Sequence, residues 1–194
     1  SYMKIPEFLG KLPYRPIVSA FTATATAEVK ADIIKMLELR DPFTITTGFD
    51  RKNLYFGVSH PHDKYSETVK IVEKYKDNCG IIYCSTRKNV ESVCEKLCAD
   101  GYNASRYHAG LSDEERRKNQ DDFIFDRVQV MVATNAFGMG IDKSNVSYVI
   151  HYNMPKNIES YYQEAGRAGR DGNEAKCILL YSGQDVATNK FLIN

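Results

Sequence analysis

The expected fold is decided by the stretch Val130-Met-Val-Ala-Thr-Asn-Ala-Phe-Gly-Met-Gly-Ile-Asp142. It opens with four apolar residues that do not alternate with polar ones, the pattern of a strand covered on both faces. Runs of the same kind recur at residues 17–21, 80–84, 128–133, 146–150 and 177–181. Because doubly covered strands are typical of parallel sheets with helices on both sides, the sequence predicts an α/β fold with a mostly parallel central sheet.

Helical patterns lie between these runs. Residues 112–123 open with Ser112-Asp-Glu-Glu115, a capping box in which Ser and Glu bond to free backbone amides. The order of strand, helix, strand, helix is that of βαβ units. Residues 87–100 place apolar side chains at the spacing of one buried helix face, namely at Val90, Val93, Cys94, Leu97 and Cys98.

The rhythm breaks at residues 41–53, where Pro42, Gly48 and a polar group at 50–53 separate a helical pattern at 26–39 from a strand pattern at 54–59. The first 45 residues supply a helix, a strand and a helix, too little to close a sheet. We therefore expect residues 1–45 to be the C-terminal tail of a truncated domain and residues 46–194 to form a second domain.

Composition sets further limits on the chain of 194 residues. Hydrophobic residues make up 43% and charged residues 26%, which excludes a wholly disordered or collagen-like chain. The net charge of +1 gives no global electrostatic case for a nucleic-acid partner, so any such partner must be argued from local sites. No apolar stretch reaches the roughly 18 residues of a membrane span, so we expect no membrane crossing.

The cysteine count is odd. With no signal-peptide pattern ahead of them, five cysteines indicate a reducing environment without disulfides. Cys94 and Cys98 are four apart, but the helix-face spacing favours core packing over a metal pair. We therefore expect neither zinc nor another metal on the five cysteines, Cys79, Cys84, Cys94, Cys98 and Cys177.

The first segment with candidate functional residues is Ser160-Tyr-Tyr-Gln-Glu-Ala-Gly-Arg-Ala-Gly-Arg-Asp-Gly172. Arg167 and Arg170 stand three apart, which predicts one helical face, and the glycines between them permit close approach of a ligand. Guanidinium groups suit phosphate oxygens, so a polyphosphate-facing edge is one interpretation. The alternative is a helix end whose arginines complement the macrodipole and pair with Glu164 or Asp171.

Within the opening stretch, a buried strand ends at Thr134-Asn135 and is followed by Gly138, Gly140 and Asp142. Ligands of open α/β sheets gather beyond the carboxyl ends of strands. The hydroxyl and the loop amides suit a phosphate, while Asp142 suits a ribose hydroxyl or one of the arginines. The alternative is a tight turn capped by Asp142.

Two more strand ends repeat this chemistry. Ser85 and Thr86 follow the strand at 80–84, and His108 to Gly110 precede the Ser112 cap. Taken singly, these residues fit helix caps and a packing histidine. Taken with Thr134 and Asn135, they predict a row along one rim of the sheet that grips successive phosphates of one strand without reading bases.

Several common catalytic motifs are absent. The sequence has no Gly-x-x-x-x-Gly-Lys-Ser/Thr loop, no His-Glu-x-x-His, no Gly-x-Ser-x-Gly and no Cys-x-x-Cys. The chain alone is therefore not expected to hydrolyse ATP.

The ordered motifs resemble those of RecQ-type DNA helicases of superfamily two. They are Phe21-Thr-Ala-Thr-Ala-Thr26, the segments 80–87, 107–111 and 132–142, His151-Tyr-Asn-Met-Pro155 and the segment 160–172. The resemblance spans nearly the whole chain. DEAD-box RNA helicases typically have different sequences at these motifs. It implies a RecA-like three-layer lobe, of the kind found in P-loop NTPase-type helicases, as the second of two motor lobes.

The resemblance also implies a function. The whole enzyme would move 3′ to 5′ on single-stranded and partly duplex DNA, as a monomer, in the cytoplasm and nucleoid or the nucleus. ATP and Mg²⁺ would be held mainly by the first lobe. By this resemblance Arg170 is the arginine finger, Arg167 positions the γ-phosphate, and Gln163 belongs to the same motif.

Further roles follow by the same carry-over. Gly140 to Asp142 would lie near the nucleotide cleft, and Thr22 to Thr26 would couple ATP hydrolysis to DNA binding in the first lobe. The residues that would track the DNA backbone are Ser85, Thr86, His108, Gly110, Thr134 and Asn135. The alternatives that stay open are an RNA helicase lobe and a nucleic-acid-binding module without ATPase activity.

Overall fold

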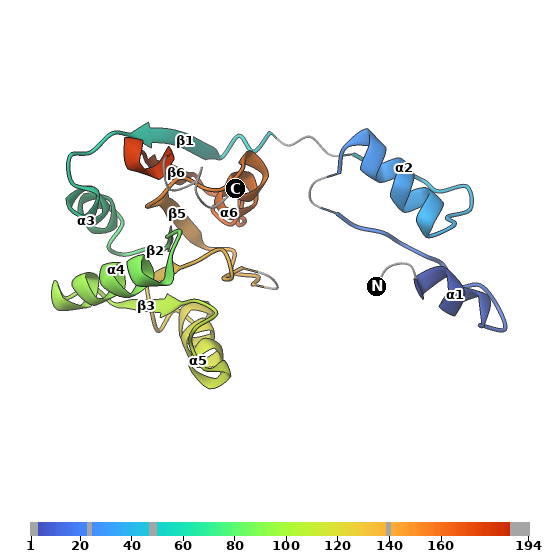
Figure 1. Cartoon of the computed structure of the whole chain (residues 1–194), viewed down its shortest axis with the longest axis horizontal. Helices are drawn as coiled ribbons and strands as arrows, with labels where there is room; N and C mark the ends of the chain where they lie inside the picture. The colour runs from blue at the N-terminus through green and yellow to red at the C-terminus, as the bar shows by residue number, and fades with distance from the viewer. Residues whose placement is uncertain (1–3, 23–24, 47–49, 139–140, 187–194) are drawn as a thin grey trace. The chain divides into compact units, whose positions relative to one another are not determined.

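The structure is a computed structural model, and it describes residues 4–22, 25–46, 50–138 and 141–186 (Figure 1). The chain divides into two compact units, Ser1–Asp50 and Arg51–Asn194. The division falls inside the polar segment 41–53 that interrupts the strand and helix pattern.

The second unit is built on a six-stranded sheet of order β1-β6-β5-β2-β4-β3, in which every pair is parallel. The predicted α/β fold with a parallel sheet is thereby confirmed. Four of the sequence runs became strands within two residues of their predicted ends. The strands are β1 (Leu54–Ser59), β2 (Cys79–Tyr83), β3 (Ala104–Tyr107), β4 (Val130–Ala133), β5 (Val146–His151) and β6 (Ala175–Leu180).

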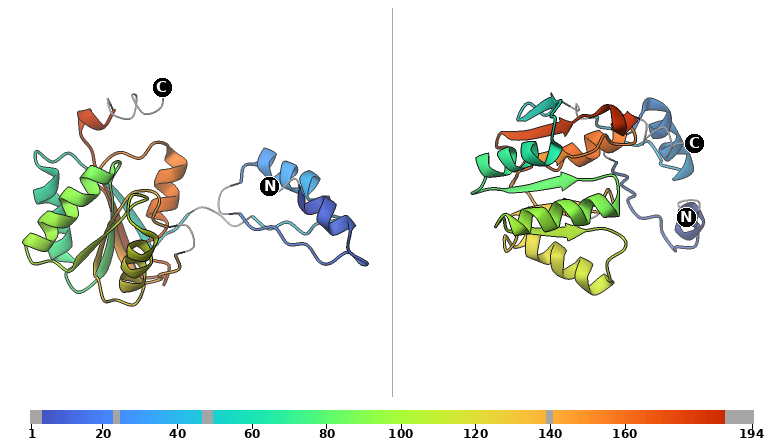
Figure 2. Two further views of the ribbon diagram at one scale, coloured as in Figure 1. Left: turned by 60° about the horizontal axis from the view of Figure 1, so that its bottom comes forward. Right: turned by 60° about the vertical axis from the view of Figure 1, so that its left-hand side comes forward.

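Helices cover both faces of this sheet, which makes three layers (Figure 2). On one face α3 (Lys64–Lys74) and α4 (Arg87–Ala99) pack through Val72 and Leu97. On the other face α5 (Asp113–Ile124) and α6 (Ile158–Ala165) contribute Phe123 and Ala165. The carboxyl ends of all six strands therefore meet at one edge of the sheet, between the helical layers.

The helix α4 follows its apolar spacing. Val90, Val93, Cys94 and Leu97 are buried, and burial of each large side chain contributes about 1.5–3 kcal/mol. The expectation that Cys98 shares this face is wrong, because Cys98 is exposed. Eight residues of helix carry Cys98 about 80° around the axis from Val90, to the edge of the buried stripe.

The capping box at the start of α5 is confirmed. Ser112 Oγ accepts from the amide of Glu115 at 3.2 Å, and Glu115 Oε2 accepts from the amide of Ser112 at 3.2 Å. The sequence pattern placed a strand end before His108. No apolar run marked that strand, β3, because its four residues are half-buried and mixed in polarity. It lies at the end of the sheet, where one neighbour suffices.

The first unit contains α1 (Ile5–Gly10) and α2 (Ala27–Met36), with Thr26 as the N-cap of α2. The predicted strand at 17–21 is wrong. Ile17 is 97% exposed, and no strand pairs with this segment within the described parts of the chain. A β-strand needs a neighbour for its backbone groups, so an apolar run without one does not form a ladder.

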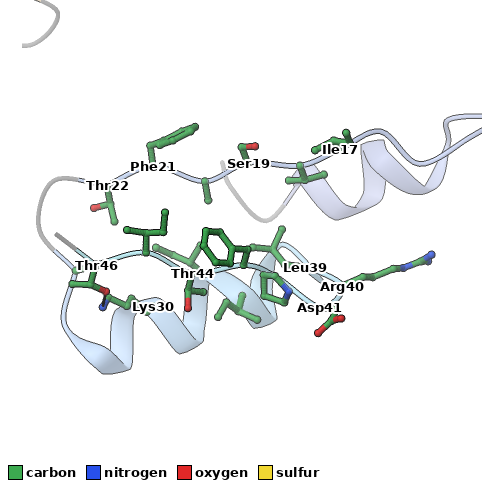
Figure 3. A pocket seen from close by; sticks show the side chains of 18 of the residues that line it. Ile17, Ser19, Phe21, Thr22, Lys30, Leu39, Arg40, Asp41, Thr44 and Thr46 are labelled. Atoms are coloured by element: carbon green, nitrogen blue, oxygen red, sulfur yellow. Dashed lines mark hydrogen bonds between the residues drawn. The ribbon is translucent and has the colours of Figure 1, made fainter.

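Apolar side chains of the first unit line an open groove of about 1060 Å³ (Figure 3). Ile17 and Phe21 border it from one segment, and Phe43 and Ile45 from another. All four are exposed, and Leu9 is the one buried hydrophobic residue of this unit within its described residues. The first unit therefore does not enclose a core of its own.

Candidate nucleotide and nucleic-acid site

Three strand-to-helix junctions lie together at one edge of the sheet. In the ladder, Tyr83 of β2 and Tyr107 of β3 are both partners of Ala133 of β4, which runs between them. The residues that follow these partners are Cys84, His108 and Thr134. The structure therefore brings together the candidate phosphate-contacting residues in the order of the strands. We call them the strand-end row: Ser85, Thr86, His108, Gly110, Thr134 and Asn135.

Ser85 and Thr86 are exposed at the end of β2. The amide of Ser85 donates to Asn153 Oδ1 at 3.1 Å, which ties this junction to the residues after β5. Thr86 Oγ1 accepts from the amide of Asn89 at 3.1 Å and caps α4. Thr86 therefore has the capping role that was its alternative interpretation.

His108 is buried, with both ring nitrogens engaged inside the protein. Its Nε2 lies 2.6 Å from Glu91 Oε1, and its Nδ1 accepts from the amide of Gly110 at 3.1 Å. Because Nδ1 is an acceptor, the proton resides on Nε2 and is donated to Glu91. His108 thus fixes the turn at Gly110, and its ring offers no free donor to a ligand.

Thr134 and Asn135 follow β4. The amide of Thr134 donates to the carbonyl of Tyr107 at 3.1 Å, and its hydroxyl accepts from the amide of Ala136 at 3.4 Å. Asn135 is exposed. At the central position of the row, the group presented to solvent is therefore an amide side chain.

Arg167 and Arg170 lie in a turn beyond the end of α6, which closes at Ala165 with Gly166 as its C-cap. The expectation that they share a helical face is wrong. Gly169, between them, has a φ of +58°, which an α-helix does not contain and which glycine adopts without a steric penalty. We call residues 166–173 the arginine turn.

The guanidinium of Arg167 lies directly against the backbone of Gly138. A Cβ placed on Gly138 would lie 2.1 Å from Arg167 Nη2, and Gly138 has a φ of +137°. Arg167 Nε is buried and has no hydrogen-bond partner among the described atoms. Burial raises the pKa of the Tyr83 phenol, and the nearby charge of Arg167 acts in the opposite direction.

Arg170 is the more exposed of the two arginines, with 36% of its side chain accessible. Its Nη1 donates to the carbonyl of Ile141 at 3.2 Å and to Asp142 Oδ1 at 3.3 Å. Glu164, which the sequence offered as a partner for the two arginines, instead bonds to His151, with 2.9 Å between Glu164 Oε2 and His151 Nε2. The side-chain amide of Gln163 donates from Nε2 to Glu159 Oε1 at 3.2 Å. Gly140, the remaining candidate near the nucleotide, lies outside the described residues.

A family model described as "Helicase conserved C-terminal domain" matches residues 63–172, which include both the strand-end row and most of the arginine turn. The chain belongs to this helicase domain family. The chain matches ATP-dependent DNA helicase RecQ of Bacillus subtilis with 47% identity over its whole length and 33% of that protein. It matches ATP-dependent helicase wrn-1 of Caenorhabditis elegans with 46% identity over 89% of the chain and 17% of that protein.

These identities confirm the resemblance of the helicase domain to RecQ-type helicases, and the chain spans about a third or less of each relative. Among solved structures, Dbp5 of Saccharomyces cerevisiae bound to Gle1 and IP6 matches with a TM-score of 0.77 and 22% identity. That match covers 96% of this chain and 49% of Dbp5. It confirms the RecA-like fold of the helicase domain.

Sequence reasoning missed two residues of the second unit that touch the arginine turn. Arg51 and Asn53 donate to backbone carbonyls of that turn, although the bonded residues are 116 to 120 positions apart in the sequence. The polar group at 50–53 marked only a boundary in the sequence. A cluster of side-chain donors directly before a strand was the signal available, but it does not identify a distant partner.

Within residues 4–22, 25–46, 50–138 and 141–186, no group of three or more His, Cys, Asp or Glu residues is arranged to hold a metal ion. In the same residues, none of the helices has the length and apolar character needed to cross a membrane.

Proposed function

We propose that this chain contains the second motor lobe of an ATP-dependent, 3′ to 5′ RecQ-type DNA helicase, in which Arg170 is the arginine finger. The observation that carries the proposal is the setting of Arg170. Its guanidinium is partly exposed, yet Ile141 and Asp142 hold it from one side. An arginine with free donors on a fixed turn suits a phosphate that another lobe presents.

Phosphoryl transfer spreads negative charge over the equatorial oxygens of the transferred group. An arginine from a partner lobe stabilises that charge, an effect of about 10³ to 10⁵ in rate in other phosphoryl-transfer enzymes. Arg167, packed on Gly138, is the less mobile partner and would position the γ-phosphate. Gln163 and Asp142 complete the proposed nucleotide-facing group.

The strand-end row is proposed to contact the backbone of single-stranded DNA. Ser85, Thr86 and Asn135 are exposed there and carry hydroxyl or amide groups, which bond phosphates without reading bases. His108 and Gly110 would act by shaping their turn, as both ring nitrogens of His108 are already engaged. Thr134 lies between these two junctions, beyond β4.

The first unit is proposed to be the C-terminal tail of the first RecA-like lobe. Its open apolar groove fits a segment whose partner strands belong to that lobe. ATP and Mg²⁺ would be bound mainly by the same lobe, because this sequence has no phosphate-binding loop of its own. Such a motor would act as a monomer on DNA in the nucleoid or nucleus.

The test is ATP turnover by the full-length protein that contains this chain, with and without single-stranded DNA. Arg170→Ala is expected to lower DNA-stimulated turnover by about a hundredfold or more while ATP binding survives. The control is Arg127→Ala, which removes another partly exposed arginine with a carboxylate partner, Asp122 at 2.6 Å. Equal turnover in Arg170→Ala and Arg127→Ala would overturn the finger assignment and favour a binding module without ATPase activity.

The same assay separates DNA from RNA as the activating strand. At one fixed salt concentration, DNA and RNA oligonucleotides of equal sequence and length are compared, since phosphate contacts make both affinities salt-dependent. Stimulation by DNA at least about tenfold above that by RNA supports the RecQ-type assignment. The reverse preference would support an RNA helicase.

A further inference from the structure

The arginine turn is held by the first residues of the second unit. Asn53 Nδ2 donates to the carbonyl oxygens of Gly169 at 2.7 Å and Asn173 at 2.8 Å. Arg51 Nη2 donates to the carbonyl oxygens of Ala168 at 3.2 Å and Gly169 at 2.6 Å. The Gly169 carbonyl belongs to the peptide group that joins Gly169 to Arg170, so this peptide group accepts two side-chain donors.

Arg51 also fixes the orientation of the Asn53 amide. Its Nε donates to Asn53 Oδ1 at 3.3 Å, which leaves the NH₂ group of Asn53 facing the carbonyls of the turn. The backbone of Asn53 contributes as well, because its carbonyl accepts from the amide of Ala175 at 2.9 Å, where β1 begins to pair with β6. Arg51 and Asn53 thus act as one unit.

Gly169 is matched to this arrangement. A Cβ on Gly169 would lie 2.5 Å from Asn53 Nδ2 and 2.8 Å from the carbonyl oxygen of Asn173. The side chain of Asn53 therefore occupies the space that any other residue at position 169 would need. The close approach depends on glycine both for space and for its positive φ.

The other side of the turn is bonded to the segment that leads into β5. The amide of Gly169 donates to the carbonyl of Val146 at 2.8 Å, and the amide of Asp171 donates to the carbonyl of Ser144 at 3.2 Å. The peptide groups on either side of Gly169–Arg170 are therefore bonded to residues 144–146, and the Gly169 carbonyl itself is bonded to Arg51 and Asn53.

We propose that Arg51 and Asn53 are positioning residues for the arginine pair, which set where Arg170 stands when it meets the nucleotide. The inference rests on the proposed function and names residues that act through Arg170. Loss of either donor would free the Gly169–Arg170 peptide group to shift. A displacement of about 1 Å in a catalytic group can lower a rate about a hundredfold.

The test is a double-mutant cycle on DNA-stimulated ATP turnover by the full-length protein. Asn53→Ala is expected to lower kcat by about tenfold or more with the KM for ATP within about twofold of wild type. In the Arg170→Ala background, adding Asn53→Ala is expected to change kcat by less than about twofold, because the group that Asn53 positions is gone. A purely structural role would lower kcat by the same factor in both backgrounds.

The matched control is Asn103→Ala. Asn103 also donates from Nδ2 to a backbone carbonyl, that of Arg127 at 2.8 Å, and it precedes β3, at the opposite end of the sheet from β1. Its removal is expected to leave kcat within about twofold of wild type. Should Asn53→Ala be unfolded at the assay temperature, Arg51→Ala, which keeps the side-chain bonds of Asn53 to Gly169 and Asn173, is measured in the same cycle.

The outcomes separate the two proposals. Loss of turnover in Arg170→Ala but not in Asn53→Ala or Arg51→Ala overturns the positioning role and leaves the proposed function intact. Equal factors in the two backgrounds overturn the positioning role as well. Unchanged turnover in Arg170→Ala overturns the proposed function, and the positioning role falls with it.

Discussion

Asp142 Oδ1 lies 3.3 Å from Nη1 of Arg170, at a surface where 94% of the Asp142 side chain is accessible to solvent. Ion pairs this exposed contribute about 0–1 kcal/mol, so Asp142 can orient the guanidinium but cannot lock it in place. The backbone carbonyl of Ile141, at 3.2 Å from the same nitrogen, is the less mobile acceptor. Arg170 therefore keeps the freedom to exchange Asp142 for a phosphate.

Asp142→Asn tests this division of roles. The variant is expected to lower DNA-stimulated ATP turnover by about two- to fivefold, because the Ile141 carbonyl still holds Arg170. The free energy of unfolding should change by less than about 1 kcal/mol. Steady-state kinetics and urea unfolding measure the two effects, and a loss as large as that of Arg170→Ala would assign Asp142 a direct part in the reaction.

Gly138→Ala is expected to displace the Arg167 guanidinium and so to lower ATP turnover. A methyl group there would collide with the Arg167 guanidinium, so turnover should fall by about tenfold or more. The control is Gly101→Ala, which has a comparable positive φ of +89° but nothing within 4 Å of its Cβ. Both variants should lose about 1–3 kcal/mol of stability from backbone strain, and only Gly138→Ala should lose activity. Equal kinetic losses would show that strain alone is responsible.

The buried ion pair of Lys64 and Asp185 is expected to contribute to stability in a pH-dependent way. The atoms Lys64 Nζ and Asp185 Oδ2 are 2.7 Å apart, and the Asp185 side chain is 4% exposed. Burial opposes the charge of Asp185, but hydrogen bonds from Lys64, Asn153 and the Ser182 amide outweigh it and lower the pKa of this carboxyl below its usual value of 3.8. Lys64→Met is expected to cost about 3–5 kcal/mol at pH 7, because it leaves an unpaired buried carboxylate.

The pH dependence has a defined sign. A lowered pKa in the folded state gives stability that is present above the unfolded pKa of about 3.9 and is lost as pH falls through the folded value. The difference between wild type and Lys64→Met should therefore narrow below about pH 4. Urea unfolding from pH 7 to pH 3 measures it, with the exposed pair of Lys70 and Glu67 as a control through Lys70→Met. A constant difference across that range would contradict the account.

One of the five cysteines, Cys98, is expected to react with thiol reagents much faster than the other four. Burial raises the pKa of Cys94 and of Cys177 to about 12, and it raises those of Cys79 and Cys84 as well. Cys98 is the exposed member. A native thiol titration is expected to show one fast-reacting group that disappears in Cys98→Ser. A second fast thiol would mean that the surroundings of one of the four buried cysteines are less tightly packed than the structure indicates.

Much of the fold was predictable because its strands are apolar and its helices carry caps. The run at 146–150 and the box at Ser112 each carry a local signal that tertiary contacts reinforce. The run at 17–21 carries the same signal but has no neighbour to pair with in the described chain, so local pattern alone misled. The arginine turn departed from helical spacing because Gly169 meets Asn53, a partner 116 positions away that no periodicity reveals.

The most direct measurement is single-turnover hydrolysis of ATP already bound to the full-length protein with single-stranded DNA. This experiment isolates the chemical step from binding and from product release. The account predicts that Arg170→Ala binds ATP and DNA as wild type does but hydrolyses the bound ATP about a hundredfold or more slowly. Hydrolysis at the wild-type rate in Arg170→Ala would contradict the central claim that this arginine stabilises the transferring phosphate.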